Sequence, residues 1–334
     1  MKIITVEEHF ESAKITQAIN EIVGKAAMPN VSKEMRHYIQ TTLPTPEIMH
    51  DVTKQRIEFM DKFEIDQQIL SYGNSSPQNL DPKIAVKLCE QANNELAKAI
   101  ATNPTRFGGL AVLPVGEPVA AATELKRAVN DLHLNGVLLK GNYQGKFFDD
   151  PFFFPIFEAA SQLDVPVYFH PSFIPTDVTQ HYFANENWSD VVTGILSSAG
   201  FGWHMDVGIQ VMRMIVSGIF DKLPNLKLVS GHWGEFVPMF LERLDDEIDA
   251  YAGLEKSFSD YYRNNVYVTP SGILSKPQLN FLLAEMGPEH LIYSIDYPYK
   301  QPKNTRTFLD NTDLTSDQLD AFTHGNAERI FHLN

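Results

Sequence analysis

The chain has 334 residues, of which 43% are hydrophobic and 21% charged, with a formal net charge of -15 and a sequence pI near 5.1. This charge disfavours nucleic acid and acidic membranes as partners, although a local basic site can still bind a small anion. No apolar run approaches the roughly 18 residues that indicate a membrane span. The length suits one large barrel, so we expect a single domain over residues 1–334.

The cysteine content and the first ten residues indicate the cellular compartment in which we expect the protein. Cys89 is the only cysteine, which excludes an intramolecular disulfide. The beginning MKIITVEEHF has neither a long apolar core nor a cleavage site. We therefore expect a protein of the reducing cytoplasm.

Short apolar runs with strand character alternate with helix-like stretches along the chain. Helical spacing of apolar residues is clear from residue 81 and again from residue 117, and Thr315 with Gln318 forms a capping-box pattern at the last helix. Repeated strand and helix units favour a parallel sheet, and the absence of Gly-x-Gly-x-x-Gly after the first run argues against a doubly wound fold. We expect an α/β fold, the (β/α)8 TIM barrel. Its strands are expected at residues 2–8, 67–72, 107–113, 136–140, 165–170, 226–231, 265–269 and 291–295.

Two connections exceed the usual length, residues 10–50 after the first strand and residues 171–205 after the fifth. The second contains many aromatic residues, which predict either stacking on a flat substrate or ordinary packing and subunit contact. These aromatic residues are Phe173, Tyr182, Phe183, Trp188, Phe201 and Trp203.

The first strand carries a pair of candidate metal ligands. In KIITVEEHF, strand alternation places Glu7 and His9 on one face and points Glu8 the other way. A Glu-x-His on one strand is common and does not by itself indicate a metal site.

Three more strands end in polar residues of the same kind. The run VPVYFH ends in His170, LKLVSGHWGE carries His232 and Glu235, and LIYSIDYP carries Asp296. In a TIM barrel, strand ends on this face form the active site, and the repetition at four strands outweighs the structural role usual for a lone histidine. Two imidazoles and two carboxylates suit a borderline divalent ion such as zinc or manganese, with positions left open for substrate or water.

The order of these motifs resembles the amidohydrolase superfamily, in its branch of metal-dependent nonoxidative decarboxylases. VEEHF is more similar to the beginning of the 2,3- and 2,6-dihydroxybenzoate (γ-resorcylate) decarboxylases than to the His-x-His of aminocarboxymuconate semialdehyde decarboxylase. Similar segments extend over nearly the whole chain. They are DVTKQRIEFMDKFEIDQQILS from residue 51, RFGGLAVLP from 106, RMIVSGIFDKLPNLKLVSGHWGE from 213 and HGNAERIF from 324.

The resemblance implies one divalent metal ion, Zn²⁺ or Mn²⁺, held by Glu7, His9, His170 and Asp296, and no organic cofactor. It implies a small carboxylic acid as substrate, bound through its carboxylate and an adjacent hydroxyl. Decarboxylation needs a proton at the carbon that bears the carboxylate. Asp296 is the first candidate donor and His232, supported by Glu235, is the second; a water is a third possibility.

Two basic residues are candidates for substrate binding. Arg243 lies eleven residues beyond His232, where the dihydroxybenzoate decarboxylases also have an arginine, and its guanidinium suits a carboxylate or hydroxyl. Lys140 ends the fourth strand, where we expect asparagine in the γ-resorcylate decarboxylases. Dinuclear amidohydrolases carbamylate a lysine there, but they begin with His-x-His, so one metal is expected here. Binding of a second anionic group is an alternative role for Lys140. The spacing assigns no role to His204 or His324, and structural roles are the simpler expectation.

Three functions stay open at this stage. The first is decarboxylation of a hydroxylated aromatic or related unsaturated acid. The second is hydrolysis of a lactone, amide or ester, in which His232 activates a metal-bound water. The third is a noncatalytic metal-binding or ligand-binding barrel. The resemblance also implies a homodimer or homotetramer.

Overall fold

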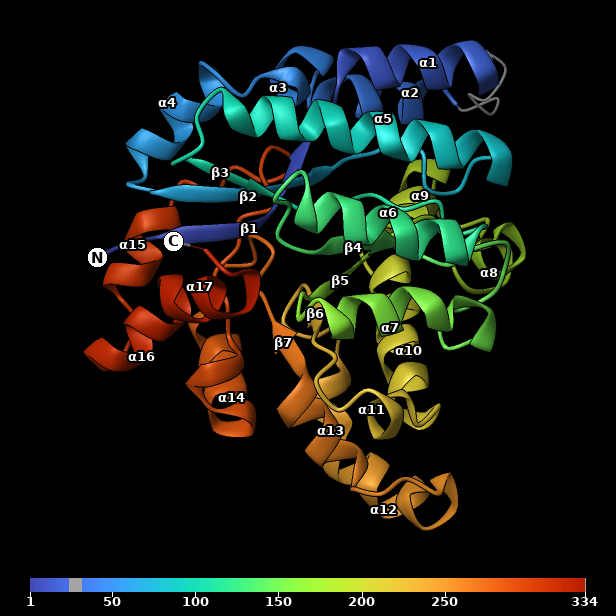
Figure 1. Cartoon of the computed structure of the whole chain (residues 1–334), viewed down its shortest axis with the longest axis vertical. Coiled ribbons are helices and arrows are strands. Elements are labelled where there is room, and N and C mark those ends of the chain that lie inside the picture. Colours follow the sequence, from blue (N-terminus) through green and yellow to red (C-terminus); the bar gives the residue numbers. More distant parts are fainter. Residues whose placement is uncertain (24–31, 334) are drawn as a thin grey trace.

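The protein is described from a computed structural model that covers residues 1–23 and 32–333. Parallel strands lie at the centre of the molecule and helices surround them (Figure 1). The strands pair in the orders β1-β2-β3 and β4-β5-β6-β7. Their bounds are β1 (Ile4–Phe10), β2 (Gln67–Tyr72), β3 (Phe107–Gly109), β4 (Val137–Lys140), β5 (Val167–His170), β6 (Leu228–Ser230) and β7 (Val266–Val268).

Isolated parallel bridges connect the two sheets into a ring. Ala111 pairs with Val137, Val268 with Leu291, and Ser294 with Val6, so residues 291–294 occupy the eighth position. This arrangement confirms the expected (β/α)8 barrel. The eighth run is not a continuous strand, because Tyr293 N donates to the carbonyl oxygen of Phe322 at 3.0 Å. Just beyond it, Ile295 N and Tyr297 N donate to the buried side chain of Glu8, each at 3.0 Å.

Helices follow the strands in the alternation expected from the sequence. The capping box at Thr315 is confirmed: Gln318 N donates to Thr315 Oγ1 at 3.3 Å, and Thr315 N donates to Gln318 Oε1 at 3.0 Å. Within the described residues, no helix is both long and apolar enough to cross a bilayer. The helices before the fifth strand are α1 (Ala13–Val23), α2 (Lys33–Thr42), α3 (Pro46–His50), α4 (Gln55–Lys62), α5 (Pro82–Ala101), α6 (Pro118–Asn130) and α7 (Phe154–Gln162). Those that follow it are α8 (Thr176–Tyr182), α9 (Asp190–Leu196), α10 (Gly202–Val216), α11 (Ile219–Lys222), α12 (Leu241–Ala252), α13 (Phe258–Asn265), α14 (Lys276–Met286), α15 (Thr305–Asp310), α16 (Ser316–Asp320) and α17 (Asn326–Phe331).

Two hydrophobic clusters form the core, one between the strands and the surrounding helices and one inside the barrel. Both sheets contribute alternate residues to the inner cluster, as buried barrel strands do. Helix α17 adds Ala327, Ile330 and Phe331 to it. The inner side chains from the strands and the residues that extend them are Ile4, Val6, Ile69, Leu110, Leu138, Tyr168, Val229, Tyr267 and Ile292.

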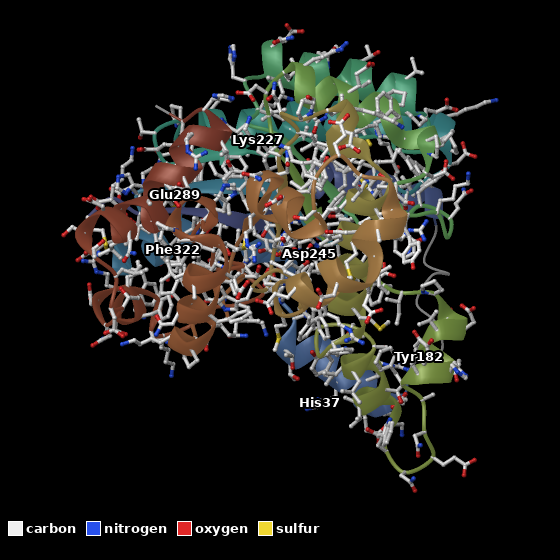
Figure 2. The ribbon with its side chains drawn as sticks, turned by 90° about the horizontal axis from the view of Figure 1, so that it is seen from below. His37, Tyr182, Lys227, Asp245, Glu289 and Phe322 are labelled. Atoms are coloured by element: carbon white, nitrogen blue, oxygen red, sulfur yellow. The ribbon has the colours of Figure 1, made fainter. Side chains whose placement is uncertain are left out.

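The two long connections contain helices rather than open loops. The segment after β1 includes α1 to α4, and the segment after β5 includes α8 to α11. They meet where Ser32 Oγ donates to Asp190 Oδ1 at 2.9 Å, and they project together from the barrel near the labelled His37 and Tyr182 (Figure 2). Both follow the carboxyl ends of their strands, so they extend the barrel at the end where TIM-barrel active sites form.

Candidate metal centre and its histidine pair

Four of the predicted site residues come together at the carboxyl end of the barrel. Ligand atoms of Glu7, His9, His170 and Asp296 all lie within 4.8 Å of one another. His9 Nε2 is 3.2 Å from Asp296 Oδ1, and His170 Nε2 is 3.6 Å from Glu7 Oε1. We call these four residues the metal-ligand cluster.

The backbone turns sharply at both carboxylates of the metal-ligand cluster. Glu7 has φ 66° and Asp296 has φ 65°, a left-handed conformation that typically costs side-chain-bearing residues about 1–3 kcal/mol. The β1–β2 register also shifts between Thr5 and Glu8, which places Glu7 in a bulge. Strand alternation alone therefore does not position Glu7. Such strain in a buried strand is often found at functional sites.

Hydrogen bonds behind the metal-ligand cluster orient its side chains. Tyr168 and Ser271 donate to Glu7 Oε2, and His170 Nδ1 lies 2.7 Å from the carbonyl of Pro171. His9 Nδ1 lies 3.2 Å from Ser71 Oγ. These contacts leave Glu7 Oε1 and the Nε2 atoms of both imidazoles directed toward the same space.

The donor atoms of the metal-ligand cluster fit a divalent cation. Glu7 Oε1 and His9 Nε2 are buried, and neither has a hydrogen-bond partner among the described residues. A buried polar atom left without a partner typically costs about 1–3 kcal/mol. Two carboxylate and two imidazole donors match the ligand preferences of zinc and manganese, and a bound cation would satisfy both unpaired atoms.

Burial shifts the pKa of every member of the metal-ligand cluster in the direction that favours the uncharged form of its side chain. It raises the pKa of Glu7, and together with the Glu7 charge it raises the pKa of Asp296 well above its usual value. Burial, followed by the charge of Lys140 for His9 and the proximity of His9 for His170, lowers the pKa of each imidazole well below 6.5. The imidazoles are therefore neutral, which is the form that binds metal.

A second cluster joins His232, Glu235 and His204 beside the first. His232 Nδ1 lies 2.7 Å from Glu235 Oε1, and His204 Nδ1 lies 3.0 Å from Glu235 Oε2. The two imidazole centroids are 4.2 Å apart. Burial opposes protonation of His232, but the charges of Glu235 and Glu7 outweigh it and raise the pKa of His232 to about 9.

The approach of α10 explains how His204 reaches Glu235. A β-carbon on Gly208 would lie 2.5 Å from the carbonyl oxygen of Glu235, so only glycine permits this packing. Residues of the turn after β6 are left-handed, with φ 48° at His232 and 52° at Glu235. His204 is the functional candidate that the sequence did not assign, because its place depends on this long-range helix contact.

The two predicted substrate-binding residues occupy different environments. Lys140 is buried at the end of β4, and its neighbour across the strand pair is His170. Arg243 lies on α12 with 72% of its side chain exposed and pairs with Glu247 at 3.1 Å. Among the described residues, no contact connects Arg243 to the metal-ligand cluster, so its role stays a prediction.

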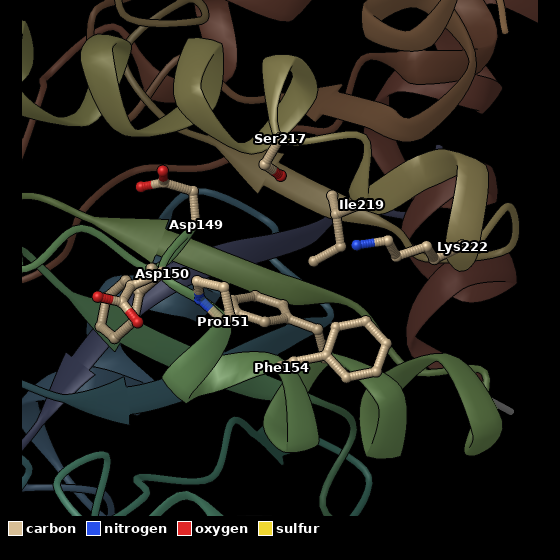
Figure 3. Close-up of a pocket in the computed structure, with 9 residues that line it drawn as sticks. Asp149, Asp150, Pro151, Phe154, Ser217, Ile219 and Lys222 are labelled. Atoms are coloured by element: carbon tan, nitrogen blue, oxygen red, sulfur yellow. The ribbon is translucent and has the colours of Figure 1, made fainter. Parts of the chain in front are cut away.

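A separate hollow of about 380 Å³ lies between α7 and the turn that joins α10 to α11 (Figure 3). Its walls include Phe148, Phe154, Phe157 and Ile219, and Lys222 lies at its edge. None of the predicted site residues lines this hollow. The hollow is therefore separate from the two polar clusters at the barrel end.

Comparisons with known proteins place this site in a family. A family model described as Amidohydrolase matches residues 49–333. The chain belongs to this amidohydrolase family. The gamma-resorcylate decarboxylase of Polaromonas sp. is 29% identical to it over 297 residues, covering 85% of this chain and 88% of that protein. The resemblance inferred from the strand-end motifs is confirmed.

Solved structures of other family members have the same architecture. A putative amidohydrolase from Staphylococcus aureus is 39% identical to this chain, with a TM-score of 0.86 and full coverage of both chains. The 5-carboxyvanillate decarboxylase of Novosphingobium aromaticivorans is 29% identical, with a TM-score of 0.87 over 99% of this chain and 96% of that one. That structure contains manganese and 4-hydroxy-3-methoxy-5-nitrobenzoic acid. The expected divalent metal cofactor is supported by this neighbour together with the metal-ligand cluster.

Proposed function

We propose that this amidohydrolase family member is a metal-dependent nonoxidative decarboxylase of a hydroxylated aromatic acid or a related unsaturated acid. The observation that carries the proposal is the metal-ligand cluster, whose unpaired Glu7 Oε1 and His9 Nε2 face a common space beside the His232–Glu235 pair. Similarity to decarboxylases over most of the chain supports this reaction over hydrolysis.

The metal-ligand cluster would hold the ion, which supplies Lewis acidity toward the substrate carboxylate and an adjacent hydroxyl oxygen. The protein must then deliver a proton to the ring carbon that bears the carboxylate. As the carbon–carbon bond breaks, its electron pair restores the aromatic ring and carbon dioxide leaves. The net reaction replaces the carboxylate with a hydrogen and consumes one proton, which solvent returns to the enzyme.

Asp296 and His232 are the two side chains that can supply this proton. Asp296 belongs to the metal-ligand cluster, where a carboxyl can exchange between metal ligation and carrying a proton. His232 is held by Glu235 through Nδ1, so Nε2 is the atom left to act on the substrate. We propose Asp296 as the first candidate and His232 as the second, with Glu235 supporting the imidazolium.

Substrate binding completes the proposal. Lys140 lies beside the metal-ligand cluster and is proposed to contact the substrate, whereas Arg243 is proposed on its sequence position alone. We further propose that the protein is a homodimer or homotetramer, which can be tested by gel filtration with light scattering. We also propose that it is cytoplasmic, which can be tested by cell fractionation.

The decisive experiment measures carbon dioxide released by protein loaded separately with Zn²⁺ or Mn²⁺, using a panel of hydroxybenzoates and related acids. Release that stops with a chelator and returns with metal supports the proposal. Hydrolysis of lactones or amides without carbon dioxide would replace it with the hydrolase function. Metal binding without turnover of either panel would indicate a noncatalytic barrel.

A further inference from the structure

Lys140 is a buried lysine at the end of β4. The residue is 9% exposed, and its ammonium forms no ion pair with any described residue. Within the described residues, Nζ donates one hydrogen bond, to the carbonyl oxygen of Gly73 at 2.5 Å. Burial of a charge is costly unless an opposite charge accompanies it. The acceptor that the ammonium contacts is therefore a neutral carbonyl rather than a carboxylate.

The sheet register places Lys140 beside the metal-ligand cluster. Lys140 and His170 are paired across β4 and β5. Paired residues of neighbouring parallel strands lie about 4.8 Å apart and point to the same face. The lysine charge contributes to the lowered pKa of both His170 and His9, which agrees with this proximity. An anion held near His170 would lie within reach of the ammonium.

Hydrogen bonds to a buried glutamine fix the backbone of Lys140. Gln78 is 1% exposed; it accepts from Lys140 N at 2.9 Å and donates to Lys140 O at 2.9 Å. A β-carbon on Gly73 would lie 2.6 Å from Met49 Cε and 3.1 Å from both Glu11 Oε1 and the Tyr299 hydroxyl. Apolar and polar side chains therefore both border Gly73, whose carbonyl oxygen accepts from the ammonium.

We propose that Lys140 is a cationic subsite that binds a second carboxylate of the substrate, on the same unsaturated or aromatic skeleton as the carboxylate that leaves. The proposal rests on the proposed function and narrows its substrate class to dicarboxylic acids. The charges of Glu11 and Asp296 attract the ammonium through space, but neither carboxylate forms an ion pair with it in the described part of the chain, and Glu11 Oε1 accepts from Ser75 N at 3.1 Å. A substrate carboxylate would provide the missing charge and a charge-assisted hydrogen bond.

The test uses unreactive acids so that binding is measured separately from turnover. Calorimetric titration compares benzoate with the three benzenedicarboxylates on manganese-loaded wild-type protein and on Lys140→Met. We expect at least one dicarboxylate to bind the wild type about tenfold or more tightly than benzoate, and this preference to disappear in Lys140→Met. Lys87→Met, at an exposed lysine of α5, is the matched control and should keep the preference.

Each remaining outcome has a definite meaning. Equal affinity for benzoate and every dicarboxylate in the wild type would overturn the subsite, as would an unchanged preference in Lys140→Met. Loss of benzoate binding, bound manganese and thermal stability together in Lys140→Met would assign the lysine a structural role and also overturn it. A Lys140-dependent preference without carbon dioxide release from any hydroxylated mono- or dicarboxylic acid would keep the subsite and reject the decarboxylase function.

Discussion

The carboxylate of Glu235 lies 2.7 Å from Nδ1 of His232, at the turn that follows β6. The side chain of Glu235 is fully buried, so its charge acts on the imidazole with little screening by solvent. This contact fixes which ring nitrogen faces the carboxylate and leaves Nε2 for the site. It also raises the stability of the imidazolium, since the Glu235 charge is the main cause that raises the pKa of His232 to about 9.

Replacement of Glu235 by glutamine should reduce kcat by about 10- to 100-fold, because His232 loses its charged support while a hydrogen bond is still possible. The pKa of His232 should fall. If His232 acts as an acid, the alkaline limb of kcat/KM against pH moves to lower pH; if it acts as a base, the acidic limb does so. A profile identical to that of the wild type would contradict a role for this pair.

His204 should act through Glu235 rather than on the substrate. Replacement of His204 by asparagine removes the imidazole 3.0 Å from Glu235 Oε2. We expect kcat to fall by about tenfold or less while KM changes little, because Glu235 loses one of the two imidazoles that orient its carboxylate. A change confined to KM would instead place His204 in substrate binding. His181→Asn, at an exposed histidine of α8, is the control and should behave as the wild type.

The sequence predicts the barrel and the four members of the metal-ligand cluster because strand periodicity and strand ends are local features. Parallel strands place their carboxyl ends at one face, so Glu7, His170 and Asp296 meet there despite their separation along the chain. The bulge at Glu7 is not visible in the alternation of residues. Its φ of 66° depends on the tertiary contacts around its carboxylate.

Long-range packing limits the rest of the sequence prediction. His204 joins Glu235 only because α10 approaches closely at Gly208. The eighth run is apolar enough for a strand, yet the buried Glu8 side chain binds two of its backbone N–H groups. A pattern of single residues does not encode such side-chain competition with the strand ladder.

Replacement of Asp296 by asparagine should lower turnover by at least about 10³-fold, because it removes both an anionic ligand and the first candidate proton donor. The metal content of the purified variant, measured by mass spectrometry, or its affinity for the metal should fall, since the amide carries no charge. Asp313→Asn, at an exposed aspartate, is the control. Wild-type turnover in Asp296→Asn would reject the assignment of Asp296.

Glu8 should support the site without binding the metal. Its carboxylate accepts from Ile295 N and Tyr297 N, the two residues that flank Asp296. Replacement by alanine leaves these buried donors unpaired and should reduce the free energy of unfolding by about 2–5 kcal/mol. Metal affinity should also fall, because the Asp296 backbone loses its anchor. Glu8→Gln keeps one acceptor oxygen and should lose less stability and less metal affinity than Glu8→Ala. Equal losses of stability and metal affinity in the two variants would contradict the anchoring role.

His290 should make the fold sensitive to mild acid. It stacks on Tyr267 with a centroid distance of 4.5 Å, and burial is the main cause that lowers its pKa below 6.5. As the pH falls below 6.5, the unfolded chain binds a proton that the folded chain resists, so this residue removes stability progressively until the pH reaches the folded-state pKa. His290→Phe keeps the stacking and removes the titration. In metal-free protein, the urea midpoint should therefore fall less between pH 7 and pH 5 in His290→Phe than in the wild type. The same replacement at exposed His37 is the control, and equal pH slopes in the wild type and His290→Phe would rule out this contribution.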